Sequence, residues 1–197
     1  NQLKLQLFTN ISHDLRTPLT LIIGPLERML AKKMGNAYIQ EQHETMHRNA
    51  SVLLQLVNQL LDFRKSESGK LQLKASKNNI VPFVENIKLS FEELAKEKQI
   101  KYSFQASSQD IEVWFDTINL KKVIYNLLSN AFKFTPNGGK VHITIVVDSF
   151  ENVAKINVED SGVGMSEEES RHVFEAFYQG VDGLKAGTGL GLSLSRA

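Results

Sequence analysis

The sequence predicts an α+β protein in which a helical hairpin, residues 1–68, is followed by an α/β sandwich, residues 69–197. Two observations support this division. The first third of the chain has only helical periodicity, whereas beyond residue 69 the two-residue period of strands alternates with the longer period of helices. The second part is therefore expected to pack helices on one sheet.

The composition excludes several classes of protein. Of the 197 residues, 42% are hydrophobic and 23% are charged, so disorder over most of the length is excluded. The net charge of +1 provides no strong field for nucleic acid or an anionic membrane. The absence of cysteine excludes disulfides, Cys-ligated zinc and a thiol nucleophile. No apolar run approaches the roughly 18 residues that span a bilayer, and no signal peptide opens the chain.

Two heptad-like series of side chains predict the hairpin. The first comprises Phe8, Ile11, Leu15, Leu19, Ile22, Leu26 and Met29, and the second Ile39, His43, Met46, Ala50, Leu53, Val57 and Leu60. The residues between them, 34–37, form a turn signal. Leu54 and Leu61 widen the second stripe beyond what two helices bury, so we expect a four-helix bundle made by dimerisation.

The second part is predicted to contain the following elements in order: a strand at Leu71 and Leu73, a helical stripe from Ile80 to Leu94 with Pro82 in its first turn, strands at 102–104 and 111–115, a helix capped by Asp116, a turn at 136–139, strands at 141–147 and 154–158, and a helix opened by a Ser166–Glu169 capping box. The Asp116 helix carries apolar residues from Leu120 to Ala131.

His13 is the candidate nucleophile. It lies about 160° from the apolar stripe of its helix, so its imidazole points away from the bundle core. An exposed helical histidine is ordinarily just surface, but Pro18 interrupts this helix beside it, and Asp14 and Thr17 are its neighbours. A neutral imidazole is a competent nucleophile near pH 7, and a carboxylate stabilises its developing charge. The chemistry permitted is transfer of an electrophile onto His13.

Candidates for handling a phosphate donor follow on the Asp116 helix. Asn126 and Asn130 lie four residues apart on one face, with Lys133 beside that face and Phe134 next. Amide oxygens suit a hard cation such as Mg²⁺, and a lysine neutralises phosphate charge. For any single asparagine, the plain alternative is a solvated helix face.

Two glycine-rich turns complete the set. Asp160-Ser161-Gly162-Val163-Gly164 comes directly after a predicted strand, where an Asp can hold a ligand amine while the backbone approaches closely. Gly187-Thr188-Gly189-Leu190-Gly191 leads into a helix, and its N–H groups suit phosphate. Each turn alone is equally explained as a tight turn, but their order after Asn126, Asn130 and Lys133 is specific.

These motifs resemble the transmitter core of the sensor histidine kinases. Residues 12–18 resemble the H box, 126–134 the N box, 160–164 the first glycine box, 174–177 the F box and 187–192 the second glycine box. Residues 58–65 also resemble those of hybrid two-component sensors. The resemblance implies a dimerisation and histidine phosphotransfer domain, residues 1–68, and a Bergerat (GHKL-type) ATP-binding domain, residues 69–197, that lacks its C-terminal end.

The resemblance also implies roles. His13 would accept the γ-phosphoryl group of ATP and pass it to an aspartate of a response-regulator receiver domain, with Asp14 assisting the imidazole and Thr17 supporting a phosphatase activity. Asn130 would hold Mg²⁺ with help from Asn126. The nucleotide would be contacted by Lys133 and Lys185, by Phe134 and Asp160 at the adenine, and by a pocket and lid shaped by Gly162, Gly164, Gly187, Thr188, Gly189, Leu190 and Gly191.

One departure concerns the F box. Many relatives carry a basic residue near Phe177 and Tyr178, where this chain has Ala176 and Gln179. Lys185 is the nearby cation that remains. Two alternatives therefore stay open: a dimeric scaffold that binds nucleotide or a receiver with little kinase activity, and another ATPase on the same fold, against which the His13 hairpin argues.

The expected surroundings follow from the resemblance. We expect a homodimer formed through the hairpin and a receiver domain as partner, with no nucleic acid bound by this fragment. Membrane association would come only through upstream segments. The chain would then be the cytoplasmic portion of an inner-membrane sensor.

Overall fold

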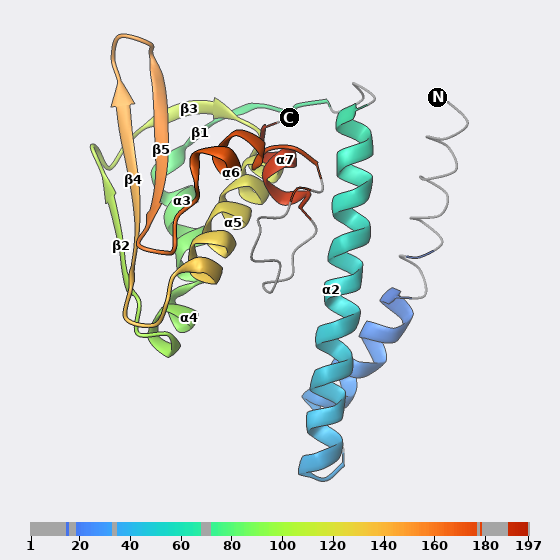
Figure 1. Cartoon of the computed structure of the whole chain (residues 1–197). Helices are drawn as coiled ribbons and strands as arrows, with labels where there is room; N and C mark the ends of the chain where they lie inside the picture. Colours follow the sequence, from blue (N-terminus) through green and yellow to red (C-terminus); the bar gives the residue numbers. More distant parts are fainter. Residues whose placement is uncertain are drawn as a thin grey trace. The chain divides into compact units, whose positions relative to one another are not determined.

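A computed structural model describes residues 15, 19–32, 35–67, 72–176, 178 and 189–196 of the chain. The chain divides into two compact units, the first ending at Leu71 and the second beginning at Gln72 (Figure 1). No helix in the described part of either unit is both long and apolar enough to cross a membrane.

The first unit is the predicted helical hairpin. Residues 19–31 are helical, and α2 (Ala37–Glu67) follows them. At the turn, Asn36 accepts a hydrogen bond from the backbone N–H of Ile39 through Oδ1 at 3.0 Å and so caps α2. Gly35 has a φ of 92°, and a Cβ there would lie 2.6 Å from Cγ2 of Ile39, so this turn requires glycine.

The hairpin buries only part of its apolar surface within the unit. Leu19, Ala50 and Val57 form its small core. Alternate members of the two predicted series remain between 41% and 50% exposed, namely Leu15, Ile22, Ile39, Met46 and Leu53. These five exposed residues form an apolar line that a second hairpin would cover in a dimeric bundle. The width of the apolar stripes in the sequence predicts such a dimer.

The strands of the second unit form two sheets. β1 (Ser76–Asn79) pairs with β3 (Glu112–Phe115) in antiparallel fashion. The other sheet has the order β2–β4–β5, in which β2 (Lys101–Ala106) is parallel to β4 (Lys140–Asp148), and β4 is antiparallel to β5 (Val153–Asp160). The register places Asp160 opposite Val141, so β5 ends where β4 begins.

Helices cover one side of this three-stranded sheet. Helices α3 (Ile80–Leu89) and α4 (Glu92–Glu97) contact β2, and α5 (Thr117–Phe134) contacts β5 (Figure 1). The side chains buried most completely between these layers are apolar: Ile80, Val84, Ile124, Leu128, Phe132, Val141, Ile143 and Ile145. Two short helices follow in the sequence, α6 (Glu167–His172) and α7 (Gly191–Arg196). Ser166 and Glu169 form the predicted capping box of α6.

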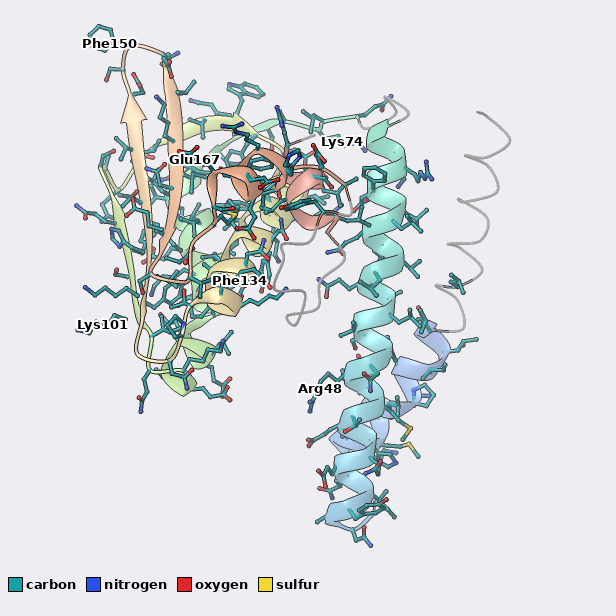
Figure 2. All side chains as sticks on the ribbon, viewed as in Figure 1. Arg48, Lys74, Lys101, Phe134, Phe150 and Glu167 are labelled. Carbon is teal, nitrogen blue, oxygen red and sulfur yellow. The ribbon has the colours of Figure 1, made fainter. Side chains whose placement is uncertain are left out.

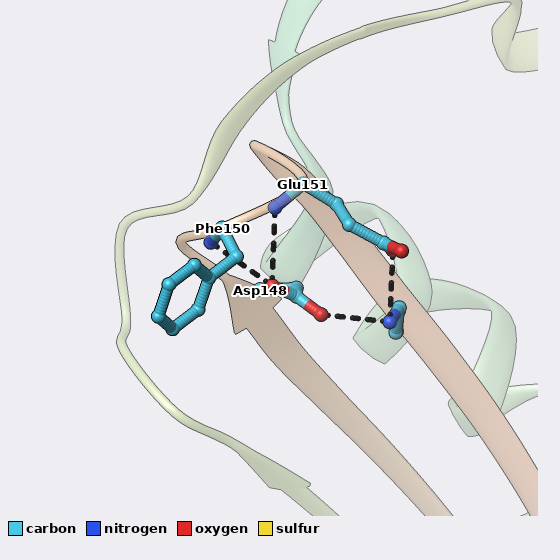
Figure 3. Close-up of polar contacts among 4 residues, drawn as sticks. Asp148, Phe150 and Glu151 are labelled. Atoms are coloured by element: carbon cyan, nitrogen blue, oxygen red, sulfur yellow. Dashed lines mark hydrogen bonds and ion pairs between the residues drawn. The ribbon is translucent and has the colours of Figure 1, made fainter.

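The turn between β4 and β5 holds their register. Phe150 lies at its tip and is fully exposed (Figure 2). Asp148 Oδ1 accepts hydrogen bonds from the backbone N–H groups of Phe150 and Glu151, and Lys155 Nζ bridges the carboxylates of Asp148 and Glu151 at 2.7 and 3.0 Å (Figure 3). The hydrogen bond from Lys155 lowers the pKa of Asp148. These contacts fix the turn, at the end of the hairpin opposite Asp160.

Two sequence expectations differ from the structure. A strand at Leu73 is wrong: residues 72–75 are not in a strand, Leu73 is 69% exposed, and β1 begins at Ser76, because only Ser76–Asn79 pair with β3. Leu71 lies outside the described residues. The helical stripe ending at Leu94 is interrupted after Leu89, where the Ser90 N–H donates to the Ile87 carbonyl and the Phe91 N–H donates to the Lys88 carbonyl. The interruption lets Phe91 stack on Phe132 with ring centroids 5.4 Å apart.

The N-cap of α5 provides a test of this unit. Asp116 accepts hydrogen bonds from the N–H groups of Ile118, Asn119 and Lys74 and from Asn119 Nδ2, and these bonds lower its pKa below its ordinary value of 3.8. A carboxylate whose pKa is lower in the folded than in the unfolded state stabilises the folded protein at pH values above the unfolded-state pKa. This stabilisation is lost as the pH falls through the folded-state pKa. We expect Asp116→Ala to lower the free energy of unfolding above about pH 5, and this deficit to shrink progressively as the pH falls below 3.8.

Chemical denaturation followed across this pH range measures the difference. The control is Glu97→Ala, which removes an exposed carboxylate from α4. A deficit in Asp116→Ala that is the same at every pH would contradict a charge-dependent cap.

Candidate functional site

One face of α5 carries the predicted polar residues. The opposite face is buried against the sheet through Ile124, Leu128, Ala131 and Phe132. Asn126, Asn130 and Lys133 lie on the side turned away from that face, yet each is only half-exposed. The helix therefore aligns three polar side chains along a surface that other parts of the unit partly cover.

The helix α7 covers the start of this polar face. Asn126 Nδ2 donates a hydrogen bond to Ser195 Oγ at 3.0 Å, and Ser195 Oγ donates to the Gly191 carbonyl at 3.0 Å. A Cβ at Gly191 would collide with Oδ1 of Asn126, so the two helices approach too closely for any side chain at this position. The structure thus brings Gly191 of the second glycine turn against Asn126.

The first glycine turn crosses the end of α5. Asp160 Oδ1 accepts a hydrogen bond from the Gly162 N–H at 2.8 Å. A Cβ at Gly162 would lie 2.8 Å from the Phe134 carbonyl oxygen and 2.6 Å from Asp160 Oδ1. Since Phe134 lies at the end of α5 (Figure 2), the structure brings together Phe134 and Asp160, which are predicted to contact adenine, and Gly162, which is predicted to shape the pocket.

Three supporting residues were not predicted from the sequence. Ser161 makes two hydrogen bonds with Lys140, the first residue of β4. Its Oγ accepts from the Lys140 N–H at 2.8 Å, and its N–H donates to the Lys140 carbonyl at 3.0 Å. Gly139 lies beside it, and a Cβ there would be 2.9 Å from Ser161 Oγ. Lys98 Nζ donates to the Phe132 carbonyl at the end of α5 at 2.7 Å. Lys98 is far from Phe132 in sequence, so no local pattern indicates this contact.

The remaining glycines and Lys133 lie near these contacts in sequence. Lys133 Nζ is 4.8 Å from the centroid of the Phe134 ring. Gly164 and Gly189 have φ values of 71° and 67°, a conformation that favours glycine, and a Cβ at Gly164 would meet open space. Leu190 is buried at 3% exposure. The Asp160 carboxylate can accept a hydrogen bond from a ligand amine, and Lys133 and the two asparagines of α5 can contact anionic groups or a metal ion.

The fit to a magnesium ion rests on oxygen donors of α5. The described residues hold no group of three or more His, Asp or Glu side chains that could bind a metal ion. An ion here would therefore rely on Asn130, on the nucleotide phosphates and on water, which is how Mg²⁺ is usually held.

His13, Asp14 and Thr17 lie outside the described residues, as do Lys185, Gly187 and Thr188. Among the described residues, close approaches bring five of the predicted site residues into two groups around α5: Asn126 with Gly191, and Phe134 with Asp160 and Gly162.

Comparison with known proteins gives two family matches. Residues 3–69 match the His Kinase A (phospho-acceptor) domain, and residues 115–197 match the histidine kinase-, DNA gyrase B- and HSP90-like ATPase family. These ranges include His13 in the first match and all predicted nucleotide-binding residues in the second.

Curated relatives align with the chain over nearly its whole length. Histidine kinase P4 of Formosa agariphila is 42% identical over 100% of the chain, and hybrid signal transduction histidine kinase D of Dictyostelium discoideum is 39% identical over 98%. The chain spans only 15% and 13% of the lengths of these relatives.

A solved structure shares the fold of both units. Full-length ShkA, crystallised in complex with AMPPNP, is 27% identical, has a TM-score of 0.78 and covers 96% of this chain, which in turn covers 39% of ShkA. With a phospho-acceptor domain followed by an ATPase domain of this kind, the chain belongs to the histidine kinase family.

Proposed function

We propose that this chain is an ATP-dependent histidine kinase core that phosphorylates itself on His13 and passes the phosphoryl group to an aspartate of a receiver domain. The observation that carries the proposal is the convergence of Phe134, Asp160 and Gly162 at one end of α5, in a chain that also has a phospho-acceptor hairpin. Residues 1–68 would form the phosphotransfer domain and residues 69–197 the ATP-binding domain.

The proposed reaction has two steps. An imidazole nitrogen of His13 attacks the γ-phosphorus of ATP, so that a P–N bond forms, the P–O bond to the β-phosphate breaks and ADP leaves. A carboxylate oxygen of the receiver aspartate then attacks the same phosphorus, and the P–N bond breaks. Asp14 would hold the imidazole and stabilise its positive charge during the first step.

The residues of the second unit would bind and orient the nucleotide. Asp160, held by the Gly162 N–H, would accept a hydrogen bond from the adenine amino group, with Phe134 beside the base. Asn130 would hold Mg²⁺, which neutralises phosphate charge when bound, and Lys133 would add a positive charge. Lys185 and the residues from Gly187 to Gly191 would close over the phosphates.

We further propose a homodimer built through the hairpin. The exposed apolar line of Leu15, Ile22, Ile39, Met46 and Leu53 is the surface that a second hairpin would bury in a four-helix bundle. Thr17, one turn from His13, would support dephosphorylation of the receiver. Because ATP is the phosphoryl donor, the chain would act on the cytoplasmic side of a membrane-bound sensor.

Incubation with γ-labelled ATP tests the proposal. Label on the chain that is lost in acid and kept in base indicates a phosphohistidine and supports the kinase. Release of free phosphate without labelled chain would indicate an ATPase instead. If neither labelled chain nor free phosphate is detected, the chain is a binding scaffold and the proposed reaction is overturned.

A further inference from the structure

Ser195 joins two helices of the second unit that lie far apart in sequence. Its Oγ donates to the Gly191 carbonyl one turn earlier in α7 and accepts from Asn126 Nδ2 on α5, both at 3.0 Å. The hydroxyl is half-buried between them. This residue is assigned no role by the sequence motifs, and its bond with Asn126 joins α7 directly to α5.

The direction of the two bonds determines how the Asn126 amide faces. A serine hydroxyl has one hydrogen, which here goes to the Gly191 carbonyl, so its oxygen can only accept from Asn126. Asn126 must therefore turn its NH₂ group toward Ser195. Its Oδ1 then lies against Gly191, in the space that a Cβ would occupy. Ser195 thus fixes an amide that could otherwise rotate by half a turn.

The same helix is held on another side by Arg196. The Arg196 guanidinium lies 5.7 Å from the centroid of the Phe174 ring. Helix α7 directly follows Gly189 and Leu190, so the contacts of Ser195 and Arg196 set where the end of the second glycine turn lies. Asn130 follows Asn126 by one turn on α5, and the same contacts therefore set the distance between this glycine turn and the polar face of α5.

We infer that Ser195 is a positioning residue for nucleotide binding, acting through the Asn126 amide to dock α7, and with it the end of the second glycine turn at residues 189–191, on α5. The inference rests on the proposed function for the identity of the ligand. It assigns Asn126 mainly to holding α7, and it leaves Asn130 as the asparagine that would face the metal ion.

The test compares two serines of α7. Ser195→Ala removes the contact with Asn126, whereas Ser193→Ala removes a hydroxyl that donates only to the nearby Leu190 carbonyl at 2.9 Å. We expect Ser195→Ala to weaken the affinity for a fluorescent ADP analogue by roughly three- to tenfold, the effect of one lost hydrogen bond. Ser193→Ala is expected to change this affinity less than about twofold, and Ser195→Thr, which keeps the hydroxyl, to restore most of it.

A double-mutant cycle shows whether Ser195 acts through Asn126. If it does, Ser195→Ala adds no further loss of ADP affinity to Asn126→Ala. Additive losses, or equal losses in Ser195→Ala and Ser193→Ala, would overturn the inference.

Amide hydrogen exchange of residues 189–196 separates this inference from the proposed function. Faster exchange in Ser195→Ala than in Ser193→Ala, without nucleotide, is the expected signature of a loosened α7. If the parent chain binds no ADP, the proposed function fails, and exchange alone decides whether Ser195 locks α7. If the amide exchange of residues 189–196 is the same in Ser195→Ala as in the parent chain, Ser195 does not hold α7 in place, even if the parent chain binds ADP.

Discussion

Replacing His13 by Gln is expected to reduce phosphoryl labelling of the chain to background while leaving ADP affinity unchanged. The glutamine amide has a similar size but no nucleophilic nitrogen, so the P–N bond cannot form. ADP affinity is expected to persist because the candidate nucleotide contacts, from Asn126 to Gly191, all belong to the second unit. Acid-labile, base-stable label measured after incubation with γ-labelled ATP is the readout.

The other histidines provide the controls for this experiment. His142 and His172 are hydrogen-bonded through Nδ1 to Ser103 and Glu175, and Nε2 of His47 lies 3.6 Å from Glu27. His43 is buried at 7% exposure on the seam of the hairpin. We expect His142→Gln to be labelled like the parent chain. Full labelling of His13→Gln would refute the assignment and move the search to these four residues.

Gly162→Ala is expected to weaken ADP binding by roughly ten- to a hundredfold. The added Cβ would meet the Phe134 carbonyl and Asp160 Oδ1 at distances that real structures do not tolerate, so either the turn or the carboxylate must move. Movement of Asp160 would remove the charge-assisted hydrogen bond that we propose it makes with the adenine amino group, a contact of about 1.5–3 kcal/mol. Titration with a fluorescent ADP analogue measures the loss.

A second glycine serves as the matched control. Gly138, in the turn before β4, has a φ of 80° and open space where a Cβ would be. Asparagine tolerates this conformation, so Gly138→Asn is expected to keep native ADP affinity. Thermal unfolding of both variants distinguishes a local effect from loss of the fold. Native ADP affinity in Gly162→Ala would show that Asp160 does not need this close approach.

Local signals in the sequence were confirmed where the deciding contact lies within a few residues. Asp116 caps α5 by binding N–H groups two and three residues later, and Ser166 and Glu169 bind each other across one turn. Apolar periodicity likewise predicted β2, β4, β5 and α5, because each buries one face whatever its partner is. The prediction of a strand at Leu73 was wrong because a strand also needs a neighbouring strand to pair with. The pairing with β3 begins only at Ser76.

The sequence by itself determined the order of the two units, the helix caps, the glycine turns and the residue types of the candidate nucleotide site. Only the tertiary structure decided which of these meet: Gly162 with the Phe134 carbonyl, Lys98 with the Phe132 carbonyl, and Ser195 with Asn126. Each of these pairs is separated by a long stretch of chain, and its geometry depends on how α5 packs on the sheet and on α7. Periodicity and capping residues indicate which secondary structure a segment forms and which of its faces is buried. They do not indicate which atom from a distant part of the chain will lie within hydrogen-bonding distance.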